Sequence, residues 1–314
     1  MKNVRSLTEG AILLAAFAVF LLITIYIPPL SVISVFFLPL PFIMYSAKYS
    51  LKNIAIFFIA AIIISFITSS LQGLGLMALF GAAGAVMGYM TQKTKSRSAI
   101  LMGGTLIFIA GLVISYVVLV TFMNINFIQE FKTMMDQSMQ QSEDMLKVIG
   151  NKEQMKLLQE QNANLIKNIK ELAPAYLITV AVVYALITQW ICFPIVKRFG
   201  IGVPSWGKFR NLSLPKSLLW FYLAALGGYL LFRPEEGTYL YLVIVNARFI
   251  LELLLLLQGL ACLLYILHQR SIGKGVAVFV VILSFILPIV HYIISVLGIA
   301  DLGFDFRKRF EKKE

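Results

Sequence analysis

Two residues of opposite charge stand four apart inside the longest apolar run of this chain. Arg248 and Glu252 lie in the segment NARFILELLLLLQG, residues 246–259. On an α-helix this spacing brings both side chains to one face, where they can form an ion pair. A single charge at the centre of a bilayer costs at least about 2.5–3.5 kcal/mol on insertion scales, so a pair is expected to face the protein interior.

Two interpretations of the pair stay open on the sequence. In the first, it joins its helix to neighbouring helices and binds no ligand. In the second, Arg248 meets an anionic ligand or lipid headgroup in a wet cavity and Glu252 holds it in place. Asn246 is a further candidate ligand-binding residue, although it lies roughly 120° around a regular helix from Glu252.

The composition indicates an integral membrane protein. Of 314 residues, 60% are hydrophobic and 13% are charged, against about half and a quarter in a soluble domain. The chain has a net charge of +12. In a membrane protein such an excess of basic residues usually lies in cytoplasmic loops that contact anionic lipids. Because the cations are scattered among short loops, we expect membrane lipids as partners and no nucleic acid.

Nine apolar segments approach the length of about 20 residues that crosses a bilayer. They run over 8–28, 31–47, 53–70, 73–91, 98–122, 174–196, 216–232, 239–268 and 275–299. Placing the N-terminus in the cytoplasm puts most loop lysines and arginines inside, which predicts a multi-pass protein of the cell membrane with this orientation. Nine spans would leave the basic tail RKRFEKKE outside, so either the last segment bends back at Pro288 or another segment does not span.

The stretch 123–173 differs from the rest because it is polar and has apolar residues at helical spacing. Gly150-Asn151 is a good turn, which predicts a helical hairpin with arms about 35 Å long. We expect it outside the cell, as a self-packed pair of helices or as a lid or docking device for an extracytoplasmic partner. The predicted domains are a membrane core at 1–200 that includes this hairpin, a cytoplasmic connector at 201–215, and a three-helix extension at 216–314.

Sequence signatures of catalysis are missing. The chain has no GxxxxGK[ST] phosphate loop, no HExxH and no Gly-x-Ser-x-Gly. Two histidines and two cysteines leave little material for a metal site, so we expect no metal, no cofactor and no catalytic residue. An intramembrane enzyme acting on lipid would have only Arg248, Glu252 and His291 to work with.

Small residues define two predicted helix faces. Ala11 and Ala15 are four apart in the first segment, and Gly84 and Gly88 have the same spacing in FGAAGAVMGYM, residues 80–90. Such faces allow another backbone to approach closely. The segment between them, LPLPFIMYSAKYS at 38–50, contains two prolines and is expected to be kinked or partly re-entrant.

This order of elements resembles the substrate-binding S-components of energy-coupling-factor (ECF) vitamin transporters over residues 1–200. The whole chain, which includes GIADLGFDFRKR at 298–309, resembles the YybS-like family of bacterial membrane proteins. The S-component resemblance implies that Ala11 and Ala15 dock on a transmembrane coupling subunit that works with ATPases. It also implies an outward-facing substrate pocket, to which Gln72 and Asn126 would contribute. The hairpin and the three extra helices depart from that pattern.

The predicted fold is an all-α polytopic membrane protein: a six-helix S-component-like core, three further transmembrane helices and an extramembrane helical hairpin. The predicted function is non-enzymatic, a transport or binding subunit for a small solute that relies on partner subunits for energy. The alternative is a membrane scaffold or signalling protein that binds no solute. A closed polar cavity favours the first, and a solid core favours the second.

Overall fold

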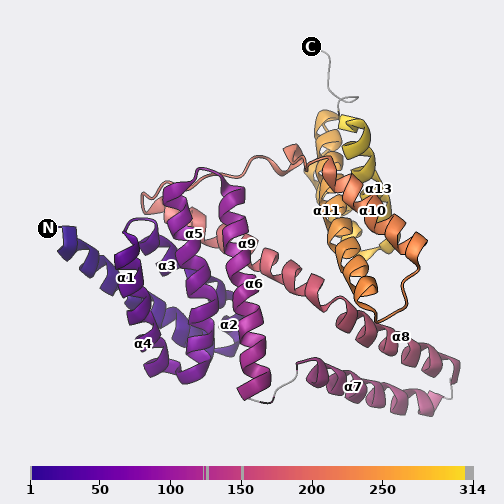
Figure 1. Ribbon diagram of the computed structural model, residues 1–314, viewed down its shortest axis with the longest axis horizontal. Coiled ribbons are helices and arrows are strands. Elements are labelled where there is room, and N and C mark those ends of the chain that lie inside the picture. The colour runs from indigo at the N-terminus through magenta and orange to yellow at the C-terminus, as the bar shows by residue number, and fades with distance from the viewer. Residues whose placement is uncertain (1, 123, 125–126, 150–151, 308–314) are drawn as a thin grey trace. The chain divides into compact units, whose positions relative to one another are not determined.

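The protein is all-helical throughout the part of the chain that its computed structural model describes, namely residues 2–122, 124, 127–149 and 152–307 (Figure 1). The helices are α1 (Lys2–Tyr26), α2 (Pro28–Ser34), η1 (Val35–Phe37), α3 (Pro39–Ser46), α4 (Leu51–Leu76), η2 (Met77–Gly81), α5 (Ala82–Lys93), α6 (Arg97–Phe122), α7 (Phe127–Ile149), α8 (Lys152–Glu171), α9 (Ala173–Arg198), η3 (Phe209–Asn211), α10 (Ser217–Phe232), α11 (Tyr239–Gln269), α12 (Lys274–Ile286) and α13 (Pro288–Phe304).

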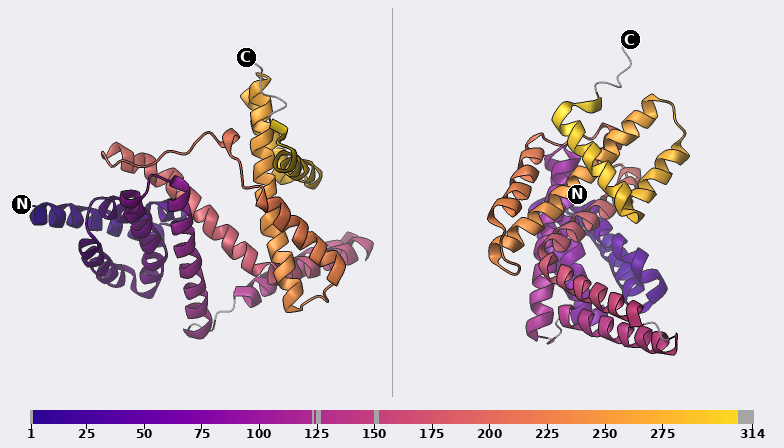
Figure 2. Two further views of the ribbon diagram at one scale, coloured as in Figure 1. Left: turned by 45° about the horizontal axis from the view of Figure 1, so that its top comes forward. Right: turned by 90° about the vertical axis from the view of Figure 1, so that its right-hand side faces the viewer.

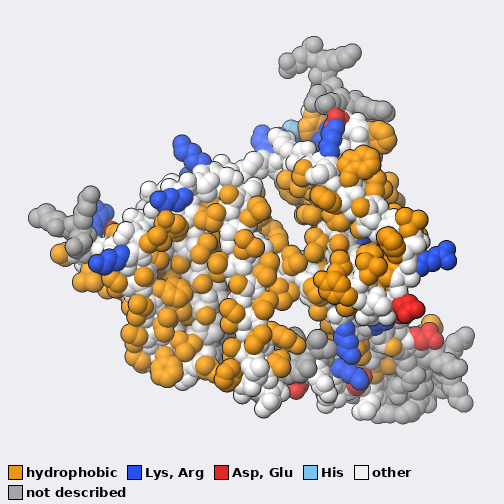
Figure 3. Space-filling model, in the orientation of Figure 1, with side chains coloured by type: hydrophobic (Ala, Val, Ile, Leu, Met, Phe, Trp, Pro, Cys, Tyr) orange, Lys and Arg blue, Asp and Glu red, His pale blue; other side chains and the backbone are white. Residues whose placement is uncertain are grey.

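Length and composition make this a polytopic membrane protein, as predicted. Among the described residues six helical segments are long and apolar enough to cross a bilayer, and the bent pair α12–α13 would add a seventh. Hydrophobic side chains cover the flanks of the helices (Figure 3), and many are open to the surroundings, such as Ile67 at 77% and Phe122 at 80% exposed. Surfaces of this kind suit contact with lipid and are uncommon on soluble proteins.

The chain forms two compact units. Unit 1 contains residues 1–137 and 177–205, and unit 2 contains residues 138–176 and 206–314. The predicted boundaries instead put the whole hairpin with the N-terminal core. The second arm of the hairpin groups with the C-terminal helices because α8 packs on α11.

Glycines bring two helices of unit 1 into backbone contact. A Cβ added to Gly84 would lie 2.6 Å from the carbonyl oxygen of Pro39, and one added to Gly88 would lie 2.5 Å from that of Ile43. Only a residue without a side chain fits at such distances. The predicted close packing of the glycine-rich helix is therefore confirmed, and its neighbour is the proline-containing segment. That segment is broken into α2, η1 and α3, as its prolines predict.

The apolar stretch 51–93 bends back on itself within α4. Ser69 and Ser70 have non-helical backbone angles, with φ of 49° at Ser70. A Cβ added to Gly73 would lie 2.7 Å from the carbonyl oxygen of Ser65, whereas eight residues of straight helix would separate them by about 12 Å. The stretch is therefore broken into two helical parts at Ser69 and Ser70, near the boundary between the predicted segments 53–70 and 73–91.

Basic residues of unit 1 gather where several helices end together. Gln92, near the end of α5, donates to the carbonyl oxygens of Ser46 and Tyr49 in the α3–α4 turn, at 2.5 and 2.8 Å. Arg97, at the start of α6, donates to the side-chain and main-chain oxygens of Gln189 in α9, both at 3.1 Å. These bonds bring the α3–α4 and α5–α6 turns to one end, so their lysines share it, which is the charge arrangement that the positive-inside rule requires.

Aromatic side chains fill the interior of unit 1. The ring of Phe80 lies 5.6 Å from that of Phe108 and 5.7 Å from that of Tyr184, while Phe42 contacts Phe17 at 5.0 Å and Phe57 at 5.3 Å. Their mostly edge-to-face geometry is the favourable one for aromatic pairs. The described part of this core is packed with large apolar groups.

Unit 2 is built on the crossing of α11 and α13. A Cβ added to Gly259 would lie 1.9 Å from the carbonyl oxygen of Ile294, and one added to Gly298 would lie 2.1 Å from that of Leu255. The chain bends by 110° between α12 and α13, at Pro288, which begins α13. The last segment therefore bends at Pro288, which is one of the two alternatives that the sequence left open.

The three predicted C-terminal spans therefore differ from one another. The helix α11 has 31 residues, about 46 Å, and exceeds the hydrocarbon thickness of about 30 Å. The helix α10 has 16 residues, about 24 Å, and is too short for an untilted crossing. The third is the bent pair α12–α13, in which Pro288 begins a new helix after the break.

The predicted hairpin arms are helices of nearly the predicted length. The helix α7 has 23 residues and α8 has 20, about 35 and 30 Å. Residues 138–149 of α7, which belong to unit 2, run beside α8 in both figures (Figures 1 and 2). The predicted turn at Gly150-Asn151 lies outside the described residues.

Candidate functional site

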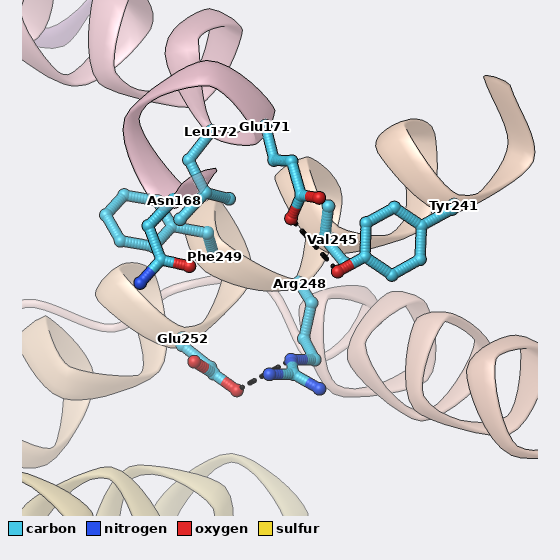
Figure 4. Close-up of a pocket in the computed structure, with 8 residues that line it drawn as sticks. All are labelled: Asn168, Glu171, Leu172, Tyr241, Val245, Arg248, Phe249 and Glu252. Atoms are coloured by element: carbon cyan, nitrogen blue, oxygen red, sulfur yellow. Dashed lines mark hydrogen bonds and ion pairs between the residues drawn. The ribbon is translucent and has the colours of Figure 1, made fainter. Parts of the chain in front are cut away.

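A small cavity of unit 2 lies between the end of α8 and the first half of α11 (Figure 4). Its volume is about 150 Å³, room for a few waters or a small solute. It is lined by Asn168, Glu171, Leu172, Tyr241, Val245, Arg248, Phe249 and Glu252. Three of these eight side chains carry charge, which makes this cavity, here called the α8–α11 pocket, the candidate site.

Capping and surface contacts hold α8 beside α11. The Oγ1 of Thr238 accepts from the backbone N–H of Tyr241 and caps the start of α11. The Nζ of Lys167 on α8 donates to Glu236 at 2.5 Å, in the loop that precedes α11. This hydrogen bond raises the pKa of Lys167. These contacts fix both walls of the pocket near the start of α11.

Asn246 joins the same elements through the backbone. Its Nδ2 donates to the carbonyl oxygens of Glu171 and Leu242 at 2.7 and 2.8 Å, and its Oδ1 accepts from the N–H of Ala175 at 2.9 Å. Glu171 ends α8, and Ala175 lies in the first turn of α9, and helix ends are where backbone groups need partners from outside the helix. Asn246 supplies these partners and does not line the pocket, which agrees with its predicted angle from Glu252.

Arg248 and Glu252 form the ion pair that their spacing predicts. The Nε of Arg248 lies 3.3 Å from Oε1 of Glu252, and the two side chains are 38% and 36% exposed. The guanidinium carbon also lies 5.7 Å from the ring centroid of Tyr229, a cation–π contact. The pair is therefore half-buried and faces the cavity, so the two groups can meet a ligand as well as each other.

A second acidic group shares the pocket. The hydroxyl of Tyr241 donates to Oε2 of Glu171 at 3.0 Å, and Figure 4 shows this carboxylate across the cavity from Arg248. Glu171 and Glu252 oppose one arginine, so the lining carries one net negative charge when both carboxylates are ionised. A negative lining disfavours the anionic ligand that the sequence left open for Arg248. Glu171 ends the polar hairpin, and sequence reasoning missed it because only the fold brings that arm against α11.

The other predicted site residues lie elsewhere. Gln72 is an exposed residue of unit 1, just after the break in α4. Asn126 lies outside the described residues. His291, on α13, does not line the α8–α11 pocket. Ala11 and Ala15 are exposed on α1, where Ile12 and Val19 are exposed as well, so this face is free for lipid or for a partner helix.

The most buried ion pair of the described residues is one that sequence reasoning missed. The Nε of Arg307 donates to Oδ2 of Asp301 at 2.7 Å, and the side chains are 14% and 4% exposed. Asp301 also accepts from Nε2 of Gln258 at 2.6 Å, while Oε1 of Gln258 accepts from the N–H of Leu214 at 2.9 Å. Nη1 of Arg307 donates to the carbonyl oxygen of Arg210 at 3.0 Å. This network ties the connector to α11 and α13.

Comparisons with known proteins agree with the membrane architecture. A family model described as "Predicted membrane protein (DUF2232)" matches residues 15–302. The chain is 33% identical over 314 residues to "Uncharacterized protein YybS" of Bacillus subtilis (strain 168), covering 98% of this chain and 99% of that protein. No solved structure matches the chain, and neither match carries the resemblance to S-components. On the span and identity of these matches, the chain belongs to the DUF2232 family of predicted membrane proteins, as its YybS-like sequence predicts.

Proposed function

We propose that this protein is a solute-binding subunit of the bacterial cell membrane and that the α8–α11 pocket is its binding site. One observation carries the proposal: Arg248, Glu171 and Glu252 line a cavity, and α11, a helix of membrane-spanning length, forms one of its walls. Ionisable groups inside membrane segments are costly and commonly mark solute or ion pathways.

The charge of the lining favours a small solute that bears an amine. Two carboxylates and one guanidinium leave a net charge of −1, which an ammonium group would neutralise. One oxygen of Glu171 is already bound by Tyr241, while its other oxygen and the carboxylate of Glu252 face the cavity (Figure 4). In this role Arg248 orients Glu252 and binds any acidic group on the same solute.

Transport would require an energy source from outside this chain. The sequence has no phosphate loop, so we propose that the protein is not an enzyme and works with a transmembrane coupling subunit and ATPases. The exposed face of α1 at Ala11 and Ala15 is the proposed docking surface, because small residues permit close helix contact. The N-terminus would face the cytoplasm, where the basic loops gather.

The binding test uses full-length protein purified from its native membrane. Mass spectrometry of bound small molecules would compare the wild type with Glu171→Gln/Glu252→Gln, and Glu130→Gln/Glu160→Gln serves as the control because it removes the same charge at exposed positions. Hydrogen bonds to charged groups contribute about 1.5–3 kcal/mol each, so the pocket variant should retain at least about tenfold less solute. Equal retention by both variants would show that the solute binds elsewhere.

The docking test compares two alanines that are both exposed on their helices. Ala15→Trp should abolish copurification of the coupling subunit without unfolding the protein, because a large ring prevents close helix contact. Ala55→Trp, on the exposed face of α4, is the matched control and should leave copurification intact. If the Ala15 variant still copurifies with its partner, α1 is not the docking helix.

A second function is favoured by the interior of unit 1. The predicted outward-facing pocket would lie among helices whose described side chains form an aromatic core, including Phe80, Phe108 and Tyr184. A solid core suits a membrane scaffold whose hairpin recruits an extracytoplasmic partner. In that case deletion of 123–173 would abolish partner recruitment, while the pocket substitutions would not affect it.

A further inference from the structure

A second hollow of unit 2 lies at the opposite end of α11 from the α8–α11 pocket. Its volume is about 320 Å³. Leu264 and Leu267 of α11 and Ala277 of α12 form apolar walls, and Ile272 of the intervening turn adds to them. This hollow, here called the basic groove, has a volume that can hold part of a hydrocarbon chain.

Basic residues border the apolar walls. Lys208 and Arg210 come from the connector around η3, and His268 comes from the last turn of α11. Among the residues that the structure describes, neither the side chain of Lys208 nor that of Arg210 takes part in an ion pair. The nearby Asp301 is already bound by Arg307 and Gln258. The rim therefore carries two basic groups that no described carboxylate neutralises.

The position of the groove along α11 is the one expected for the membrane surface. The helix is long enough to extend beyond the hydrocarbon, and the groove lies at its last turns. The connector adds Phe209, which is 46% exposed, and Trp206, which is 42% exposed. Aromatic and basic residues in one short segment are typical of the headgroup layer.

We propose that the basic groove is a binding site for an anionic phospholipid of the leaflet next to the connector residues Lys208 and Arg210. Its acyl chain would lie against Leu264 and Ala277, and its phosphate would accept hydrogen bonds from Lys208 and Arg210. Charge complementarity selects an anionic lipid over a zwitterionic one, and the apolar walls select a lipid over free phosphate. This inference is independent of the function proposed for the α8–α11 pocket.

Native mass spectrometry of the full chain in detergent tests the site. The probes are phosphatidylglycerol and phosphatidylcholine with the same acyl chains. The wild type should retain phosphatidylglycerol preferentially, and Lys208→Gln/Arg210→Gln should lower that affinity about 30-fold, at about 1 kcal/mol for each basic residue. Lys197→Gln/Arg198→Gln is the matched control, because it removes one lysine and one arginine from the exposed end of α9.

Two further measurements distinguish binding of the whole lipid from binding of its headgroup alone and from attraction to the protein's overall charge. Ala277→Trp fills the groove and keeps every charge, so it should also reduce lipid retention, and glycerol phosphate should compete poorly. An equal loss in the Lys197/Arg198 control would mean that the lipid is held by overall charge and would overturn the proposal. Full competition by glycerol phosphate, or unchanged binding by Ala277→Trp, would equally rule out a lipid groove.

Discussion

Arg307→Leu is expected to destabilise unit 2 more than any exposed charge substitution in this chain. The change leaves Asp301 buried, with only 4% of its side chain exposed, while Gln258 still donates to it. Removing one partner of a buried ion pair costs about 3–5 kcal/mol because an uncompensated charge is left behind. The remaining amide donor puts the expected cost at the lower end, about 3 kcal/mol.

Thermal unfolding in detergent measures this cost. For domains of 150–250 residues each kcal/mol lowers Tm by roughly 2–4 °C, so Arg307→Leu should lower Tm by about 6–12 °C. Asp301→Asn combined with Arg307→Leu removes both charges and should recover most of that loss, leaving about 1 kcal/mol for the lost bond to Arg210. A Tm near the wild-type value for the single variant, or no recovery in the double one, would contradict the assigned network.

Three further substitutions probe unit 2 by the same melts. Arg248→Leu should lower the free energy of unfolding by about 1 kcal/mol, because the pair is more than a third exposed. The loss should exceed that of Arg248→Leu/Glu252→Leu, which leaves no unpaired charge. The reverse order would mean that the pair is not internal. Gly259→Leu should prevent the α11–α13 contact and lower Tm by several degrees or abolish folding, whereas Gly227→Leu, where a Cβ meets nothing within 4 Å, should change Tm little. Tyr241→Phe should cost about 1 kcal/mol through the lost hydroxyl bond, and an unchanged Tm would indicate that water replaces it.

Local patterns predicted several elements of this protein well. Pro39 and Pro288 each begin a new helix after a break, because proline lacks the N–H and clashes with the preceding turn, whereas Pro41 lies within the first turn of α3. Gly84 and Gly88 lie in backbone contact with α3, as small residues at a spacing of four predict. Each of these signals acts within one helix or at one contact face, so the sequence carries it directly.

The pocket and the buried network depended on contacts between distant segments. Glu171 is 70 residues from Tyr241, and Asp301 is 43 from Gln258. Both carboxylates occur in stretches that are unremarkable alone, one at the end of a polar hairpin and the other near the end of the last apolar segment. No periodicity in the sequence relates such positions, so neither contact could be predicted.

The amino-acid sequence by itself determined the membrane class, the helical content, the main breaks and the pairing of Arg248 with Glu252. These follow from hydrophobicity, backbone sterics and helix geometry, all of which act over a few residues. Only the tertiary structure decided that α8 returns to α11, that Glu171 makes the pocket acidic, and that Asp301 and Arg307 form the buried pair. The reason is physical: burial and electrostatic environment are properties of the space between helices, and that space exists only after the helices have packed.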